Sequence, residues 1–317
     1  VGIRGNQIEI QTIGRMPEAV FEEVKTAKQQ NLKQQNLKQQ NLKVGLHPRI
    51  PKDEYLQKVE TIRQHIVEGD LYEMNLCQEF FSENADLDPV AVFERLSEIG
   101  KAPFSTFMRW RDRYLLSASP ERFLKKEGQK LISQPIKGTR RRALQEDKKM
   151  REELLNSEKD RAENVMIVDL VRNDLARNCE PGSVQVEELF GIYTFETVHQ
   201  MISTVTGILK NEHHALHALR DAFPPGSMTG APKVMAMELI EKYEHTRRGL
   251  YSGAVGYFSP EGDFDFNVVI RSILYNTAAR YVSVQVGGAI VYDSVPEQEY
   301  DECLLKAEAM VRALSQF

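Results

Sequence analysis

The sequence contains only three cysteines, Cys77, Cys179 and Cys303, among 317 residues. They lie far apart, none belongs to a CxxC pair, and no histidine stands at metal-ligand spacing from them. We therefore expect neither a disulfide framework nor a cysteine-based zinc site. The three side chains are interpreted as reduced structural cysteines of a cytoplasmic protein.

The sequence also lacks a long apolar run, a signal peptide and an excess of positive charge. No stretch approaches the length of a membrane span, so no membrane association is expected. A formal net charge of −5, without a basic stripe interleaved with aromatics, argues against nucleic-acid binding. The composition, 41% hydrophobic, is typical of a soluble globular protein with one large or two ordinary domains. Because the chain opens on Val1 rather than Met, we expect a processed or truncated product.

The N-terminal region carries few structural signals. Residues 1–13 alternate well enough for a strand or hairpin, and residues 17–28 have the pattern of a short helix. Residues 29–43 repeat QQNLK three times, and on a helix their leucines would step by about 140° and form no stripe. We therefore predict an N-terminal remnant and low-complexity linker over residues 1–45, and one main domain over residues 46–317.

Hydrophobic periodicity and turn signals predict the main secondary structure of the second part. Helices are expected over residues 51–69, 89–99, 143–156, 157–174 and 234–243, and from residue 294 onward. Strands are expected over residues 70–81, 103–118 (two strands with a charged turn), 249–258, 264–275 and 280–290.

The stretch of residues 117–142 contains two chemically unusual charged residues. Glu121 follows a Ser-Pro pair, which holds the next residue in a defined turn. Lys137 ends an apolar strand just before Gly138, with no carboxylate within several positions. Such a lysine can be a nucleophile if positive charge on Arg140–Arg142 lowers its pKa. The alternative is an exposed lysine at the end of a strand, which this stretch alone favours.

Two predicted helices place carboxylates beside apolar residues. Glu163 lies on the apolar face of the helix over residues 157–174, and Glu299 and Glu302 lie three apart in the C-terminal helix. The residues 294–297, Ser-Val-Pro-Glu, predict a capping box at the start of that helix. Glu163 and Glu302 can jointly hold Mg²⁺, which prefers oxygen ligands. The alternative is a surface pair of Glu302 with Lys306, worth only ~0.3–0.5 kcal/mol.

The remaining signals are weak when each is taken alone. The Gly/Pro-rich residues 222–233 precede a helix whose N-terminus favours an anion. Arg271 is predicted on an apolar strand face, where an arginine usually holds a carboxylate. Gly287-Gly288 ends a strand and permits close backbone approach. His199 by itself is more typical of a hydrogen-bonded core histidine than of a catalyst.

Taken together, these motifs resemble one family. SASPERF, QPIKGTRR, EKDRAENVMIVDLVRND, PPGSMTGAPK, YSGAVGY, VVIRS and VQVGGAIVYDSVPEQEYDECLLKAEAM occur in the order seen in the chorismate-utilising enzymes. This family includes anthranilate synthase, aminodeoxychorismate synthase, and the isochorismate and salicylate synthases. The resemblance covers roughly residues 50–314. It implies an α+β fold like that of anthranilate synthase component I, with two facing β-sheets and outer helices in one large chorismate-binding catalytic domain.

Two positions separate the branches of this family. The members that use water carry a lysine where this chain has Glu73, and the amine-transferring members usually carry glutamine there. Water is therefore not the expected nucleophile. At Lys137 the motif P-I-K-G-T resembles the aminodeoxychorismate synthases, in which this lysine is a covalent nucleophile, whereas anthranilate synthases typically have P-I-A-G-T.

The resemblance implies a mechanism. Lys137 attacks ring carbon C2 of chorismate while the 4-hydroxyl leaves, with Glu121 as general acid. Ammonia then adds at C4 and expels the lysine, which gives 4-amino-4-deoxychorismate, the precursor of p-aminobenzoate for folate. Mg²⁺ is expected on Glu163, Glu299 and Glu302. The other implied residues are His199 and Thr229 near the ring, and Gly138, Thr139, Tyr251, Arg271, Gly287, Gly288 and Lys306 as substrate-binding residues.

The expected partner is a glutamine amidotransferase subunit that supplies the ammonia, because no amidotransferase signature is present in this sequence. Two alternatives remain. One is anthranilate synthase component I of tryptophan biosynthesis, which also eliminates pyruvate. The other is a non-catalytic subunit that only binds and activates the amidotransferase.

Overall fold

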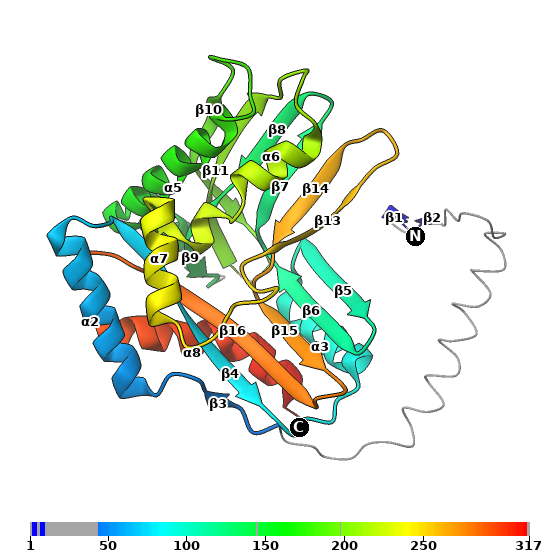
Figure 1. Ribbon diagram of the computed structural model, residues 1–317, viewed down its shortest axis with the longest axis vertical. Coiled ribbons are helices and arrows are strands. Elements are labelled where there is room, and N and C mark those ends of the chain that lie inside the picture. Colours follow the sequence, from blue (N-terminus) through cyan, green and yellow to red (C-terminus); the bar gives the residue numbers. More distant parts are fainter. Residues whose placement is uncertain (1, 5–6, 10–43, 144, 197, 316–317) are drawn as a thin grey trace. The chain divides into compact units, whose positions relative to one another are not determined.

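Two antiparallel β-sheets, each with seven strands, form the framework of the computed structural model (Figure 1). The structure describes residues 2–4, 7–9, 44–143, 145–196 and 198–315. Residues 44–315 form one compact unit. In the other unit, β1 (Gly2–Arg4) and β2 (Gln7–Glu9) pair as an antiparallel hairpin, as predicted. The predicted helix over residues 17–28 and the linker over residues 29–43 lie outside the described residues.

The first sheet has the strand order β10-β11-β8-β7-β14-β13, and β9 also pairs with β11. Its strands are β7 (Arg122–Glu127), β8 (Lys130–Gln134), β9 (Ile136–Arg141), β10 (Gln185–Thr194), β11 (Val198–Ile208), β13 (Ala254–Phe258) and β14 (Phe264–Val268).

The second sheet has the order β12-β4-β16-β15-β6-β5, and β3 pairs with β4. Its strands are β3 (His47–Pro48), β4 (Glu73–Ser82), β5 (Phe104–Trp110), β6 (Arg113–Ser119), β12 (Gly230–Ala231), β15 (Ser272–Asn276) and β16 (Tyr281–Ile290). The longest ladder joins β16 to β4 over nine residue pairs, from Val282↔Ser82 to Ile290↔Met74.

Each sheet packs against its own helices and has its own hydrophobic cluster (Figure 1). Helices α4 (Asp147–Asn156), α5 (Glu158–Ala176) and α6 (Ala215–Ala222) accompany the first sheet. Helices α2 (Lys52–Glu68), α3 (Pro89–Gly100), α7 (Lys233–Tyr243) and α8 (Pro296–Leu314) accompany the second sheet. The expected α+β fold, with two sheets and outer helices, is confirmed.

Local signals fix several helix ends where the sequence places them. Gly69 ends α2 in the left-handed conformation with φ 87°, which glycine adopts without strain. The hydroxyl of Ser157 accepts a hydrogen bond from the backbone N–H of Asp160 and caps α5. The capping box predicted at Ser294 is wrong, because α8 begins with Val295 as its N-cap and Ser294 Oγ donates to Glu299 instead.

The chain passes between the two sheets four times, and two of these crossings are neighbours. After β6 it leaves the second sheet at Pro120-Glu121 and enters β7 of the first sheet. After β14 it returns through residues 269–271 to β15. The two crossings are tied together, because Ser119 Oγ donates to Val268 O at 2.6 Å and the N–H of Val268 donates to Glu121 O at 3.0 Å.

The crossing at residues 269–271 corrects a prediction. The sequence predicts one strand over residues 264–275, and the structure divides it into β14 and β15, which belong to different sheets. Arg271 has a φ of +50°, so the backbone turns there and Arg271 shares no strand face with its apolar neighbours. Each half of the segment instead finds its own antiparallel partner, β7 or β6.

Candidate active site

A cavity of about 630 Å³ lies where the two sheets meet. β9 and β11 of the first sheet and β4 and β16 of the second all contribute to its wall, as do α5 and α8. Ten predicted site residues line it: Glu121, Lys137, Gly138, Thr139, Glu163, Tyr251, Arg271, Gly287, Glu302 and Lys306. The fold thus brings to one place residues that are separated by up to 185 positions in the sequence.

Lys137 lies in the cavity wall and not on an exposed strand end. Its side chain is only 10% exposed. Its Nζ donates to Glu73 Oε1 at 2.8 Å and lies 3.7 Å from Glu163 Oε2. Burial favours the neutral amine, but the charges of Glu73 and Glu163 outweigh it and raise the pKa of Lys137 above its ordinary value.

This arrangement contradicts the expected lowering of the lysine pKa by the neighbouring arginines. Each arginine is neutralised by its own carboxylate: Arg140 pairs with Asp160 at 2.7 Å, Arg141 with Glu308 at 3.0 Å, and Arg142 with Asp147 at 2.6 Å. Strand geometry carries these side chains toward α4, α5 and α8. Lys137 is therefore a protonated ammonium in the free site, and it needs a base to become a nucleophile.

Glu73 is the group best placed to act as that base. It is completely buried on β4, and its second oxygen, Oε2, has no hydrogen-bond partner among the described residues. Two positions along the same strand face, the buried Oδ1 of Asn75 also lacks such a partner. Unpaired buried acceptors are costly, so both oxygens require hydrogen-bond donors. Asn75 lines the cavity, whereas Glu73 lies outside the lining and contacts it through Lys137.

Glu121 lies at the first sheet crossing and is 6% exposed. Burial raises its pKa to about 7, although the hydroxyl of Ser227, which donates to Glu121 Oε1 at 2.7 Å, and the charges of Lys137 and Lys306 act in the opposite direction. A carboxyl group with such a pKa is partly protonated near neutral pH and can act as a general acid.

The predicted metal ligands do not share one environment. Glu163 and Glu302 line the cavity, whereas Glu299 does not, and its Oε1 accepts from Ser294 at 2.7 Å. Burial raises the pKa of Glu163 and Glu299, while at Glu302 the charge of Lys306, 2.5 Å away, overcomes the effect of burial and lowers the pKa.

The oxygen atoms of these carboxylates are the donor type that Mg²⁺ prefers, but they are not already arranged around one point. Among the described residues, the only three ligand groups whose atoms lie within 4.8 Å of one another are those of His65, Glu68 and Asp70, outside the cavity. Mg²⁺ commonly uses one or two carboxylates and keeps several waters. Glu163 and Glu302 present all-oxygen donors on one cavity wall, which meets this requirement.

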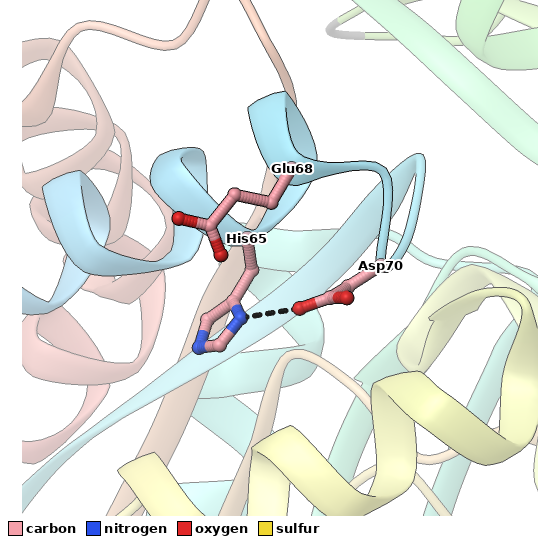
Figure 2. A group of neighbouring side chains, drawn as sticks. All are labelled: His65, Glu68 and Asp70. Carbon is pink, nitrogen blue, oxygen red and sulfur yellow. Dashed lines mark hydrogen bonds and ion pairs between the residues drawn. The ribbon is translucent and has the colours of Figure 1, made fainter.

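The group of His65, Glu68 and Asp70 has a structural role, because His65 is hydrogen-bonded to neighbouring elements (Figure 2). Figure 2 shows the hydrogen bond from the ring to Asp70, in which Nδ1 lies 2.7 Å from Oδ2. Nε2 is 2.8 Å from the hydroxyl of Tyr243 on α7. Both ring nitrogens are thus occupied, and the histidine joins the end of α2 to α7.

Among the predicted substrate-binding residues, two glycines allow close packing of the cavity wall, and Arg271 supplies positive charge. An added Cβ at Gly287 would lie 2.5 Å from Asn75 Oδ1, and one at Gly138 would lie 2.8 Å from Leu154 Cδ1. Arg271 donates to Lys306 O at 2.7 Å and pairs with no carboxylate in the described part of the chain, so its remaining donors can serve a ligand.

Four predicted residues lie outside the cavity lining: His199, Thr229, Gly288 and Glu299. His199 is completely buried, with Nε2 3.2 Å from Asp147 Oδ1 and Nδ1 3.0 Å from Thr194 Oγ1. It has the environment of a hydrogen-bonded core histidine, the alternative that its sequence context favours. The hydroxyl of Thr229 donates to backbone carbonyls of the turn that contains η1 (Gly226–Met228).

The glycine- and proline-rich residues 222–233 contribute differently from the prediction. No residue of α7 lines the cavity, so the helix N-terminus is not the anion site expected there. Instead the turn places Ser227 and Met228 in the wall.

The structure also reveals residues that the sequence signals did not identify. Lys159, Gln200 and Gln285 line the cavity. Behind them, Arg248 forms a buried pair with Glu244 at 2.5 Å and donates to the backbone oxygen of Asn75 at 2.9 Å. Lys159 and Gln285 lie within motifs of the family resemblance, but no local signal singles them out, and only their contacts give them a role.

Comparison of the sequence with known proteins identifies the family of this chain. The chain belongs to the chorismate binding enzyme family, whose model matches residues 4–312. It is 44% identical over 263 residues to aminodeoxychorismate synthase component 1 of Salmonella typhimurium, covering 82% of this chain and 57% of that protein. It is 40% identical over 280 residues to the chloroplastic aminodeoxychorismate synthase of Arabidopsis thaliana, covering 87% and 30% respectively.

A solved structure agrees with the fold. The crystal structure of anthranilate synthase component I from Streptococcus pneumoniae has a TM-score of 0.78 and 32% sequence identity, over 92% of this chain and 66% of that one. The chain spans between about a third and three fifths of the length of the curated relatives described above. No helix in the described residues is long and apolar enough to cross a membrane.

Proposed function

We propose that this chain converts chorismate and ammonia to 4-amino-4-deoxychorismate, as aminodeoxychorismate synthase component I does. The observation that carries the proposal is the buried Lys137, whose Nζ reaches the cavity wall beside two carboxylates. The relatives named aminodeoxychorismate synthase support the same activity. The product would serve p-aminobenzoate and folate synthesis.

Glu73 prepares the nucleophile in the proposed first step. It accepts a proton from Lys137 across the 2.8 Å hydrogen bond, which leaves a free amine to attack C2 of the ring. Glu121 is protonated by virtue of its raised pKa and donates its proton to the 4-hydroxyl, which leaves as water. Ammonia then forms the new C–N bond at C4, and the bond to Lys137 breaks.

The substrate's two carboxylates require positive charge in the cavity. Arg271 and Lys306 supply fixed charge in the wall, and the hydroxyl of Tyr251 and the backbone at Gly138, Thr139 and Gly287 complete the contacts. Glu163 and Glu302, with Glu299 behind them, would hold Mg²⁺, which when bound neutralises substrate carboxylate charge. His199, Thr229 and Gly288 support the wall from behind.

Ammonia would come from a glutamine amidotransferase subunit. The name "component 1" of the Salmonella relative supports a partner protein. Free ammonium at high concentration is expected to replace that partner.

A product assay tests the proposal. The chain is incubated with chorismate, Mg²⁺ and ammonium, and we expect 4-amino-4-deoxychorismate, which yields p-aminobenzoate only after a separate lyase is added. Omission of ammonium is the control. Fluorescent anthranilate formed without lyase would establish the anthranilate synthase alternative. The 32% identity to the Streptococcus pneumoniae anthranilate synthase component I is the reason to test for it. Absence of any chorismate turnover would favour a non-catalytic subunit.

A further inference from the structure

A second, much smaller cavity lies directly behind Glu121. Its volume is about 20 Å³, and it shares Glu121 and Ser227 with the lining of the large cavity. The rest of its wall is mostly apolar and comes mainly from β7, α5 and the turn around η1, with single residues of α6, β8 and β14. A space of this size accommodates one water molecule, provided that polar groups are present to hold it.

One wall of this small cavity carries a buried carboxylate with a free oxygen. Asp174 on α5 is 5% exposed, and its Oδ2 accepts from Lys233 Nζ at 2.7 Å. Its Oδ1 is buried and has no hydrogen-bond partner among the described residues. An unpaired carboxylate oxygen in an apolar surround is expensive, so Oδ1 requires a donor.

The other polar side chains of the lining do not supply that donor. Arg122 uses its guanidinium on Asp265 and Gln134, and the hydroxyl of Ser133 donates to Phe123 O at 2.9 Å. The hydroxyl of Ser227 donates its hydrogen bond to Glu121 Oε1. Ser227 Oγ therefore has lone pairs that are free to accept a hydrogen bond, as Asp174 Oδ1 is.

The position of Ser227 depends on tight packing of its turn on α5. An added Cβ at Gly226 would lie 2.5 Å from Leu170 Cδ2, so η1 packs directly on this side chain of α5. This packing is what places Ser227 and Asp174, one helical turn beyond Leu170, around the same small space.

We propose that the small cavity holds one ordered water molecule that donates to Asp174 Oδ1 and to Ser227 Oγ, and so fixes the hydroxyl of Ser227 on Glu121. The inference rests on the proposed role of Glu121 as general acid. The water makes Asp174 and Lys233 positioning residues for that carboxyl group, although neither lines the large cavity.

The water affects the proton affinity of Glu121 through one hydrogen bond. A donor fixed on the carboxylate stabilises its charged form and opposes the effect of burial. The charged groups that face Glu121 from other elements are Lys137 on β9 and Lys306 on α8. Those that act on Asp174 are Lys233 and Arg177. None of these charges changes when the water alone is removed.

The test combines crystallography with a cavity-filling variant. A crystal structure of the full chain, at a resolution where ordered waters are visible, is expected to show a density peak within hydrogen-bond distance of Asp174 Oδ1 and Ser227 Oγ. An empty cavity would overturn the proposal. Val171→Ile adds one methyl group to a residue that lines the small cavity, and its crystal structure is expected to lack the peak.

The kinetic readout is the pH at which the rate falls because Glu121 loses its proton. In Val171→Ile this pH is expected to rise by about 0.5 unit, because the serine hydroxyl is no longer held on the carboxylate. Ser227→Ala is expected to raise it at least as much, and Val171→Ile to add nothing in that background. Val168→Ile, the same change on the same helix at a buried residue outside the small cavity, is the control.

Equal shifts in Val171→Ile and Val168→Ile, or additive shifts with Ser227→Ala, would overturn the proposal. A chain that forms no 4-amino-4-deoxychorismate would refute the proposed function instead. In that case the density peak still decides whether the water is bound.

Discussion

At the scale of single residues, Lys137 is controlled by carboxylates from two other elements. Glu73 on β4 and Glu163 on α5 keep its ammonium charged in the free site. A nucleophilic role therefore depends on proton transfer within the site and not on a low intrinsic pKa.

Lys137→Ala is expected to abolish covalent chemistry and to lower kcat with chorismate by roughly 10³-fold or more, because the nucleophile is removed. Mass spectrometry of the unmodified chain, incubated with chorismate and without ammonia, should show a gain of one chorismate less one water. Lys148→Ala, at an exposed position, should retain this adduct. Failure of the unmodified chain to gain this mass would remove Lys137 from the mechanism.

The raised pKa of Glu121 sets the expected pH dependence of the reaction. Its pKa of about 7 lies above the ordinary value for a glutamate, so the protonated acid prevails below about pH 7 and disappears above it. The rate is expected to fall as pH rises through this value, as a plot of kcat/KM against pH would reveal. Glu121→Gln should remove this limb together with most of the activity, and a limb that persists in this variant would assign it to another group.

At the scale of elements, the best predicted features are those with strong local causes. Helix α2 ends at Gly69 and α5 begins after Ser157, because glycine and serine satisfy the helix ends through local geometry. The division of residues 264–275 between two sheets was not predictable, because both halves have the alternation of one continuous strand. The available partner strands decided it.

Close packing of β16 on β4 predicts a specific stability loss. Gly287→Ala would bring a methyl group within 2.5 Å of Asn75 Oδ1 and 2.7 Å of the backbone oxygen of Leu76. Backbone cannot yield easily, so we expect a loss of about 1–3 kcal/mol in the free energy of unfolding. Chemical denaturation measures it. Gly45→Ala, where an added Cβ meets nothing within 4 Å, should be close to neutral, and equal losses in both variants would contradict the packing argument.

At the scale of the whole molecule, residues 44–315 contain both hydrophobic clusters and the complete cavity. The residues of the site come from both sheets and from helices α5 and α8, so the site requires the two layers to be joined. Four chain crossings join the layers, and the two beside Glu121 and Arg271 are hydrogen-bonded to each other.

A chain shortened to residues 44–315 is therefore expected to fold with a melting temperature within ~2 °C of the longer chain, and to retain chorismate turnover with ammonium. Calorimetry and the product assay check this. A large drop in melting temperature would show that residues 1–43 contribute to the stability of the main unit.

The sequence by itself determined the helix boundaries with local caps, most strands of the second sheet, and the ordered motifs that identify the family. These features depend on residues close together in the chain, or on motif order alone. The sequence predicted no strand over residues 185–208, where β10 and β11 lie. The tertiary structure decided the pairing of Glu73 with Lys137 across 64 positions and the exclusion of His199 from the cavity wall. It also decided the neutralisation of the arginines that follow Lys137. Electrostatic environment depends on distance in space and on burial, and both arise only when the two sheets pack together.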